Sequence, residues 1–204
     1  MEQNFFQHES ADVDPSASIG EKTYIWQNVQ VRATAKVGSE CIIGKGAFID
    51  FGAVVGNRVK VQNYANIFRG VTLEDGVFIG PSVCFTNDLF PRAVTPDGRL
   101  QDYLDWKCYE TLVKEGAGIG AGSIIVCNTT IGKWAIIGSG SVVTRDIPDY
   151  ALAFGNPARV RGFVCPCGTK LPERNNLAEE ENVTCPECNK EITLPACPEL
   201  IKKD

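Results

Sequence analysis

Residues 31–49 read Val31-Arg-Ala-Thr-Ala-Lys-Val37-Gly-Ser-Glu-Cys-Ile-Ile43-Gly-Lys-Gly-Ala-Phe-Ile49. A large aliphatic residue returns at every sixth position, and a small or β-branched residue follows four positions after it. The same frame extends from Val13 to Phe85 and resumes, in a new phase, from Val113 to Val143. This is a hexapeptide repeat, and a sustained repeat of short period is typical of solenoid folds.

A period of six fits neither an α-helix, with about 3.6 residues per turn, nor one continuous strand. It predicts short strands joined by corners, with the large residue filling the interior. Three such sides make one triangular coil of about eighteen residues, and coils stack as parallel sheets about 4.8 Å apart. The residue after the large one is often glycine, which we interpret as the source of positive φ at the corners. These glycines are Gly20, Gly38, Gly44, Gly56, Gly80, Gly120, Gly132 and Gly138.

Length and charge narrow the class of protein. The chain has 204 residues and a formal net charge of −5, which fits one sizeable domain with an appendage. It carries no basic stripe, so we expect no nucleic acid partner. It also lacks a long apolar run and a secretory signal, so we expect a cytoplasmic protein that does not enter the membrane. Its nine cysteines are better explained as buried residues or metal ligands than as disulfides.

A long excursion interrupts the repeat over residues 86–112. It contains prolines, charged residues, aromatic residues and a Pro-Asp-Gly turn at residues 96–98. A loop of this length inside a compact repeat is uncommon and usually functional. Trp26 and Phe68 occupy outward positions where other repeats carry glycine, and exposed aromatic residues of this kind favour contact with another subunit.

The C-terminal part carries a cysteine pattern. We predict a β-helix domain over residues 1–162 and a Cys-rich tail over residues 163–204. Four cysteines form two close pairs and predict a zinc-ribbon-like metal site, because tetrahedral zinc takes four thiolates. They are Cys165, Cys167, Cys185 and Cys188. The Cys-x-Cys spacing of the first pair is less regular, so reduced cysteines without metal stay the alternative. We expect zinc to order only this small tail, and removal of residues 165–204 to leave activity largely intact.

Three further segments carry a family resemblance: residues 70–81, residues 85–92 with Phe85-Thr-Asn87, and residues 143–159 ending in Gly155-Asn-Pro-Ala-Arg159. With the repeat, they resemble the left-handed β-helix acetyltransferases that N-acetylate nucleotide-linked amino sugars. The chain looks most like the UDP-2-acetamido-3-amino-2,3-dideoxy-glucuronate N-acetyltransferases, with the dTDP-3-amino-3,6-dideoxyhexose N-acetyltransferases close behind. The resemblance covers about residues 8–170. One departure is Trp26-Gln-Asn28, where many relatives carry Trp-His-Phe.

This resemblance implies an all-β fold, a left-handed parallel β-helix of about six coils with one long inserted loop. It also implies a homotrimer that binds acetyl-CoA between two subunits and makes sugars for surface polysaccharides. Asn87 matches the family's catalytic position beside the sugar amine. An amide orients an amine but cannot remove its proton, so the departing CoA thiolate, as a thiol of pKa about 8.5, is the expected acceptor. The alternative for Asn87 is a turn-initiating role before Asp88.

Further candidate residues fall into two sets, and for each a plain surface or packing role stays open. Those for the nucleotide sugar supply charge, hydrogen bonds or a stacking ring, and they are Arg69, Glu74, Asp88, Arg92, Trp106 and Lys107. Those for acetyl-CoA belong to the segment Gly116–Gly122, which bears few side chains along which a pantetheine arm could lie, and to later segments that hold arginines for the CoA phosphates. They are Gly116, Ala117, Gly120, Ala121, Gly122, Arg145, Pro157 and Arg159.

Three rival functions fit the same repeat. A γ-type carbonic anhydrase needs three histidine ligands, whereas this chain has one histidine, His8. An O-acetyltransferase needs a base to activate a hydroxyl group, which the missing histidines also disfavour. A non-catalytic binding solenoid would not need the excursion at residues 86–112.

Overall fold

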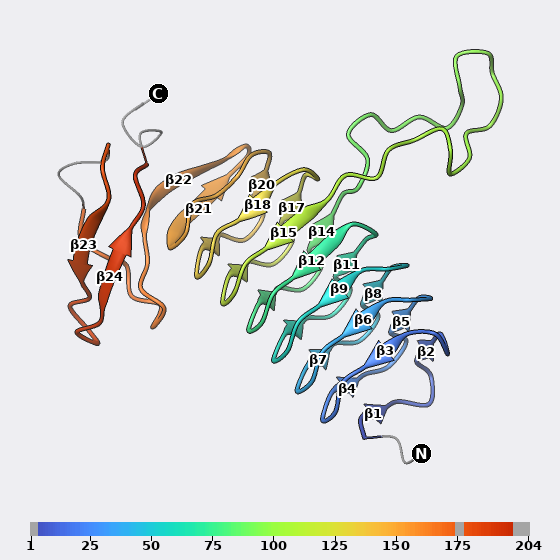
Figure 1. The fold of residues 1–204 in the computed structure, drawn as a ribbon, viewed down its shortest axis with the longest axis horizontal. Helices are drawn as coiled ribbons and strands as arrows, with labels where there is room; N and C mark the ends of the chain where they lie inside the picture. Colours follow the sequence, from blue (N-terminus) through green and yellow to red (C-terminus); the bar gives the residue numbers. More distant parts are fainter. Residues whose placement is uncertain (1–3, 174–177, 198–204) are drawn as a thin grey trace.

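The computed structural model describes residues 4–173 and 178–197, which contain twenty-four strands and no helix (Figure 1). Most strands are two residues long and belong to three parallel sheets, which form the three walls of a prism. Wall A consists of β1 (Phe6–Gln7), β4 (Tyr24–Ile25), β7 (Ile42–Ile43), β10 (Lys60–Val61), β13 (Phe78–Ile79), β16 (Gly118–Ile119), β19 (Ile136–Ile137), β21 (Ala151–Gly155) and β22 (Ala158–Phe163). Of the described residues, none belongs to a helix long and apolar enough to cross a bilayer.

The other two walls complete each coil. Wall B consists of β2 (Asp12–Val13), β5 (Gln30–Val31), β8 (Phe48–Ile49), β11 (Asn66–Ile67), β14 (Cys84–Phe85), β17 (Ile124–Ile125) and β20 (Val142–Val143). Wall C consists of β3 (Ser18–Ile19), β6 (Lys36–Val37), β9 (Val54–Val55), β12 (Val71–Leu73), β15 (Thr111–Val113) and β18 (Thr130–Ile131). The chain visits the walls in the order A, B, C, so we name the corners A–B, B–C and C–A. Wall B has seven strands and wall C six, close to the predicted six coils.

The repeat sets both register and core. Paired residues on neighbouring strands are 18 positions apart, as for Asn66 and Phe48, so equivalent repeat positions stack above one another. The large residues form an interior ladder, in which Ile43, Ile67 and Ile119 are fully buried. Burying one such side chain contributes roughly 1.5–3 kcal/mol, and each coil gains this only through its neighbours.

The glycines that follow the large residues have a different role from the one predicted. Positive φ angles occur two positions later in the repeat, as at Lys22 (58°) and Gly46 (65°), not at Gly38 or its equivalents. At Gly38 an added Cβ would lie 2.5 Å from the carbonyl oxygen of Gly56, on the next coil. These glycines therefore permit close approach of stacked coils, and our assignment of the corner conformation to them was wrong.

The excursion leaves wall B after Phe85 and re-enters wall C at Thr111, so it covers residues 86–110 rather than 86–112. Across it, Phe78 pairs with Gly118, 40 positions later instead of 18, which inserts 22 residues into one coil. Figure 1 shows this segment as an arm that projects away from the B–C corner. Beyond the last coil, β21 pairs in antiparallel fashion with β22, and β23 (Glu181–Thr184) with β24 (Glu191–Leu194). Part of the predicted tail, residues 174–177 and 198–204, lies outside the described residues.

Candidate functional site

The first group of candidate residues lies at the base of the arm. Asn87 lies two residues after the end of β14 and is half-buried. Its backbone carbonyl accepts a hydrogen bond from Tyr109 N over 3.1 Å, which ties the two ends of the arm together. Next to Asn87, the Thr86 hydroxyl accepts a hydrogen bond from Cys127 N over 3.0 Å. The backbone at Asn87 is thus fixed from two sides at the B–C corner.

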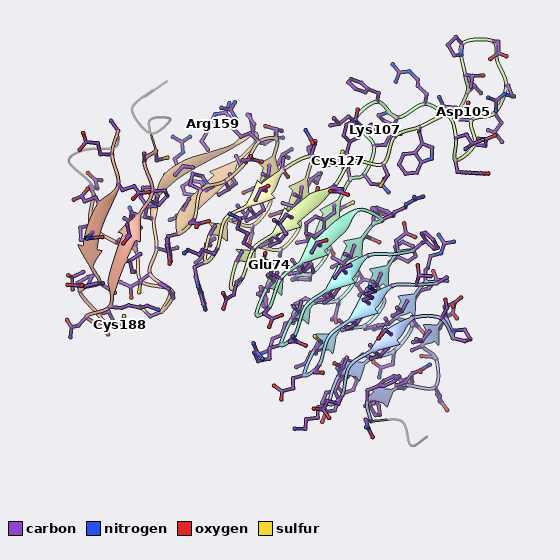
Figure 2. All side chains as sticks on the ribbon, in the orientation of Figure 1. Glu74, Asp105, Lys107, Cys127, Arg159 and Cys188 are labelled. Atoms are coloured by element: carbon purple, nitrogen blue, oxygen red, sulfur yellow. The ribbon has the colours of Figure 1, made fainter. Side chains whose placement is uncertain are left out.

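Three of the predicted sugar-binding residues surround this base. Arg69 occupies the B–C corner one coil below, where its carbonyl contacts Cys108 Sγ at 3.4 Å and its guanidinium lies 5.5 Å from the Phe51 ring centroid. Asp88 accepts a hydrogen bond from Phe90 N over 2.8 Å, so the side chain that shapes the turn here is Asp88 and not Asn87, for which the turn-initiating role was the alternative. Lys107 is exposed, with Nζ 4.8 Å from the Tyr109 ring centroid. Figure 2 places Lys107 and Cys127 together near the base of the arm.

The outer arm has its own fixed geometry. Arg99 bonds to Asp105 over 2.7 Å, and this hydrogen bond holds the pKa of the Asp105 carboxyl below its ordinary value. The predicted Arg92 guanidinium donates to the Pro91 carbonyl, and Trp106 is half-buried. Large apolar side chains on the arm are exposed, namely Phe90, Val94, Leu100, Tyr103 and Leu104.

Glu74 does not belong to this group. It follows β12 at the C–A corner, at the other end of wall C from the arm (Figure 2). Its Oε2 accepts a hydrogen bond from the backbone N–H of Glu115 over 2.8 Å, which joins two successive coils. The interaction is structural in kind, because it satisfies a corner N–H that would otherwise need water.

A second group of candidates surrounds a hollow of about 440 Å³ on the outer face of wall A. Its floor comes from three successive coils, and its side from the beginning of the tail. The lining residues are Phe78, Gly116, Gly118, Ile119, Gly120, Trp134, Ile136, Ile137, Gly138, Ser139, Cys165, Pro166 and Gly168. We call this the wall A hollow. Of the predicted cofactor residues, Gly116 and Gly120 line it.

The glycines of the hollow differ in what the fold requires of them. Gly116 has a φ of +68°, and an added Cβ would lie 2.5 Å from the Trp134 ring. At Gly120 an added Cβ would lie 2.5 Å from Ser139 N. Corner geometry and coil packing therefore explain both without any ligand. Gly122, with a φ of +66°, is likewise explained by its corner.

Gly118 is the exception, and it was not among the predicted site residues. An added Cβ there would have no neighbouring atom within 4 Å, and its φ is not positive. The residue sits on β16 between Phe78 on β13 and Ile136 on β19, so its missing side chain leaves a notch in wall A. One sequence signal could have found it: Gly118 is the only glycine that directly precedes a large interior residue of the repeat.

The remaining cofactor candidates are dispersed. Ala117 is fully buried in the core, so only its backbone could contact a cofactor, as the prediction for this segment supposed. Ala121 is exposed at the A–B corner, and Pro157 is exposed in the turn between β21 and β22. Arg145 lies at the B–C corner after β20. Arg159 pairs with Phe154 across the β21–β22 hairpin.

Phe154 connects this hairpin to the hollow. An added Cβ at Gly138 would lie 2.7 Å from Phe154 Cβ, so the hairpin packs onto a lining residue. The Arg161 guanidinium lies 6.0 Å from the Phe154 ring centroid. Cationic side chains of β22 therefore lie beyond the Gly138 edge of the hollow, and the cysteine-containing turn bounds another side of it.

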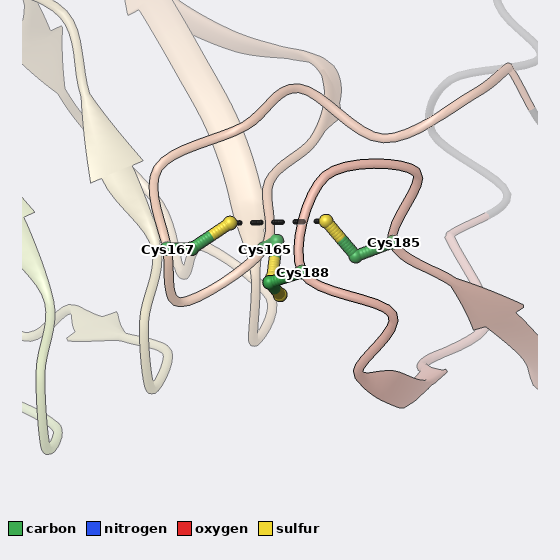
Figure 3. Close-up of side chains that lie close together, drawn as sticks. All are labelled: Cys165, Cys167, Cys185 and Cys188. Atoms are coloured by element: carbon green, nitrogen blue, oxygen red, sulfur yellow. Dashed lines mark hydrogen bonds between the residues drawn. The ribbon is translucent and has the colours of Figure 1, made fainter.

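The four predicted metal ligands come together (Figure 3). Their Sγ atoms all lie within 4.8 Å of one another. Cys165 Sγ is 3.5 Å from Cys188 Sγ, and Cys167 Sγ is 3.7 Å from Cys185 Sγ. Zinc bound tetrahedrally at about 2.3 Å from each sulfur would place the sulfurs about 3.8 Å apart, so the donor set and its spacing fit this ion.

Local contacts prepare the turns that carry these ligands. Cys165 N donates to the carbonyl of Thr169, and Cys185 N donates to that of Lys190, each over 2.9 Å. A hydrogen bond with the Thr169 hydroxyl lowers the pKa of the Cys167 thiol to about 6. Burial raises the pKa of the Cys165 thiol to about 12. A bound cation would favour the thiolate form at all four positions.

Comparison with known proteins agrees with this fold. No family model matches the chain. Over 68 residues the chain is 62% identical to the dTDP-3-amino-3,6-dideoxy-alpha-D-galactopyranose 3-N-acetyltransferase of Aneurinibacillus thermoaerophilus, a match that covers 33% of this chain and 35% of that protein. It is 34% identical over 134 residues to the galactoside O-acetyltransferase of Lactococcus lactis subsp. lactis, covering 62% of each chain.

A crystal structure from Bacillus cereus, of a provisionally named acetyltransferase, is similar with a TM-score of 0.52 and 25% identity. The match covers 80% of this chain and 86% of that one. The chain spans only 35% of the length of the first curated relative and 62% of that of the second. In its repeat and its three parallel walls, the chain has the β-solenoid fold of the left-handed β-helix acetyltransferases.

Proposed function

We propose that this chain transfers the acetyl group of acetyl-CoA to the amino group of a nucleotide-linked amino sugar. The observation that carries this proposal is the position of Asn87, a half-buried amide held at the mouth of a long arm. Among the described residues, no hydrogen bond engages its side chain. Its carbonyl oxygen is therefore available to accept a hydrogen bond from a substrate amine.

In the proposed reaction, the protein acts mainly by holding the sugar amine and the thioester of acetyl-CoA in line. The neutral amine attacks the thioester carbonyl, a C–N bond forms, and the C–S bond breaks to release CoA as a thiolate. The proton of the resulting ammonium passes to that thiolate, so no protein base is needed. Alignment of the two reactants by Asn87 lowers the barrier by several kcal/mol in the manner of effective molarity.

The position of the histidine favours N-acetylation over O-acetylation. His8 follows β1 at the A–B corner of the first coil, where its Nδ1 lies 2.9 Å from Ser10 Oγ. Asn87 lies at the B–C corner four coils further along the prism, a separation of about 19 Å along the axis. A hydroxyl acceptor needs a base near the reacting atoms, and within one chain His8 cannot supply it.

The wall A hollow is the proposed site of the pantetheine arm. Its floor is apolar and is notched at Gly118, and the nearby β22 carries Arg159 and Arg161. Guanidinium groups pair well with phosphates, so they would receive the nucleotide end of CoA. Arg145 lies at another corner and is less suited to this role.

A complete site would need more than one copy of the chain. In a triangular prism, wall A faces away from the opposite corner, which is the B–C corner where Asn87 lies. One chain cannot present both features to one thioester. We therefore propose a homotrimer in which the wall A hollow of one copy faces the arm of another. Exposed Leu100, Tyr103 and Leu104 would be covered in that assembly.

For the sugar, we favour a dTDP-3-amino-3,6-dideoxyhexose over UDP-2-acetamido-3-amino-2,3-dideoxy-glucuronate. The Aneurinibacillus thermoaerophilus relative, named for the first of these, is 62% identical over 68 residues. The family resemblance implies a role in sugar synthesis for surface polysaccharides, and we propose that the reaction takes place in the cytoplasm.

The test is a direct assay of both nucleotide sugars with acetyl-CoA, followed by thiol release and by mass spectrometry of the sugar product. We expect a gain of one acetyl group on the 3-amino sugar and faster turnover with the dTDP substrate. Acetylation of a plain galactoside hydroxyl, without reaction of either amino sugar, would contradict the proposal. Turnover of the uronate alone would keep the reaction and reverse the choice of sugar.

A further inference from the structure

The Cys-rich tail shares a surface with the wall A hollow. Cys165, Pro166 and Gly168 line the hollow together with Gly116, Gly118 and Gly120 of the solenoid. This shared surface was not predicted from the sequence, because the tail begins more than forty positions after the glycine segment. We call residues 165–169 the knuckle.

The knuckle begins two residues after the end of β22, which fixes one of its ends to the solenoid. Phe163 and Val164 are buried, and Leu171 N donates to the Phe163 carbonyl over 2.9 Å. Only short turn contacts shape the residues between these anchors, with Gly168 N bonding to the Cys165 carbonyl over 2.8 Å. Cys167 and Gly168 themselves are exposed.

The four sulfurs link the knuckle to the turn between β23 and β24, in addition to buried apolar side chains of the tail such as Leu171, Ile192 and Leu194, which belong to the same core cluster as the solenoid. Cys165 and Cys167 face Cys188 and Cys185, which belong to the turn between β23 and β24. A metal ion bound by all four would join two turns that each lack a large core of their own. Without it, thiol contacts of 3.5 and 3.7 Å would be the direct link between the two cysteine pairs.

We infer that the metal-loaded knuckle is a side wall of the cofactor groove, and that metal occupancy sets the affinity of this groove for CoA. The inference rests on the proposed function for the identity of the ligand. The geometric part of the inference does not depend on the proposed function, because the notch at Gly118 and the knuckle line the same hollow whatever ligand binds there. The inference replaces our expectation that zinc orders the tail alone and that removal of residues 165–204 leaves activity largely intact.

A substitution that fills the notch at Gly118 tests whether CoA binds in the wall A hollow. Gly118→Leu should fill the space between Phe78 and Ile136 without disturbing the fold, because φ at this residue is ordinary and its Cβ has open space. We expect at least about a tenfold rise in the Kd for CoA, as for the loss of one well-packed contact. Ser18→Leu, at the equivalent repeat position of β3 on wall C, is the matched control and should leave Kd unchanged.

The two turns supply a second matched pair. Pro166 and Pro186 each follow a buried cysteine ligand, Cys165 and Cys185, but only Pro166 lines the hollow. Pro166→Glu places a carboxylate beside the bound ligand and should weaken CoA binding about tenfold. Pro186→Glu should leave it unchanged. Both variants keep all four thiols, and zinc content measured by atomic absorption verifies that the metal is retained.

Metal removal is the decisive measurement. The full chain, as purified with zinc, is compared with the same chain after chelation and with Cys188→Ser, using calorimetric titration of CoA. We expect the Kd to rise about tenfold in both, while circular dichroism of the solenoid stays unchanged. Rebinding of zinc should restore affinity to the chelated chain but not to Cys188→Ser.

The outcomes separate the two proposals. If Gly118→Leu weakens CoA binding but chelation and Pro166→Glu do not, the groove is correct and the role of the knuckle is overturned. If the zinc-loaded wild-type chain does not bind CoA at all, the proposed function fails first. A purified chain that holds no zinc, and cannot be loaded with it, also overturns the inference.

Discussion

Tyr109 N donates to the carbonyl oxygen of Asn87 over 3.1 Å, which closes the arm at its base. The bond uses only backbone atoms, so it fixes the position of Asn87 and leaves the side-chain amide free for a substrate. The same geometry would survive truncation of the side chain. Substitution of Asn87 therefore tests its chemistry separately from its structural place.

We expect Asn87→Ala to lower kcat between about 10-fold and about 1000-fold, as for a lost orienting contact, with the Kd for CoA nearly unchanged. Steady-state kinetics and calorimetry measure the two quantities. His8→Ala should be much milder. A nearly inactive His8→Ala enzyme beside an Asn87→Ala enzyme of normal rate would reverse the assignment and bring the first coil of another copy to the site.

The pH dependence of kcat/KM should report the substrate amine, because the proposed mechanism has no protein base. Activity should fall at low pH as the amine becomes protonated and loses its nucleophilic pair. The midpoint should move when a sugar with a different amine pKa is used. A midpoint that stays with the enzyme across substrates, and shifts in a protein variant, would indicate a base on the protein.

Glu74→Ala should lower the free energy of unfolding by about 1 kcal/mol, because it removes the acceptor of one hydrogen bond between coils. That acceptor is Oε2, 2.8 Å from Glu115 N. Glu74→Gln keeps an oxygen at this place and should recover most of the loss. Chemical denaturation measures the change, and kcat should be unaffected. A large loss of kcat at full stability would return Glu74 to the substrate site.

Substitution by alanine should lower the free energy of unfolding at one glycine, Gly38, and leave it nearly unchanged at another, Gly118. Gly38→Ala would bring a Cβ to 2.5 Å from the Gly56 carbonyl oxygen, and we expect about 1–3 kcal/mol of destabilisation from this overpacking. Gly118→Ala meets open space and should change stability by no more than about 0.5 kcal/mol. Thermal unfolding of the two variants, measured side by side, checks both values. Equal effects would show that coil spacing does not explain these glycines.

The chain should be a trimer in solution, with a mass by light scattering three times that of one chain. Trp26 is 38% exposed beside Phe6, 5.6 Å away between ring centroids, which leaves an aromatic cluster to be covered. Phe68, in contrast, packs edge-on against Phe48 at 5.7 Å within the chain and is a weaker argument for a partner. An active monomer would overturn the assembly and the shared site together.

Periodicity determined the fold. Residues such as Ile43, Ile67 and Ile119 are spaced so that only a coil of three short sides brings all of them inside, and each coil needs only its neighbours. The excursion was also evident, since it breaks the frame at Phe85 and restores it at Val113. The cysteine pairs were recognisable because their ligand spacing is local.

Only the tertiary structure decided how distant segments meet. The repeat gives each residue a place in its own coil, but it does not reveal the atoms one coil away. The stacking role of Gly38 and the bond of Glu74 to Glu115 depend on those atoms. Asn87 and the outer face of wall A lie on opposite sides of the prism, and this follows from the order of the three walls within each coil. Pro166 lines the same hollow as the notch at Gly118 because β22 runs antiparallel to β21 and returns the chain toward the C–A corner, and no periodic signal encodes such a return.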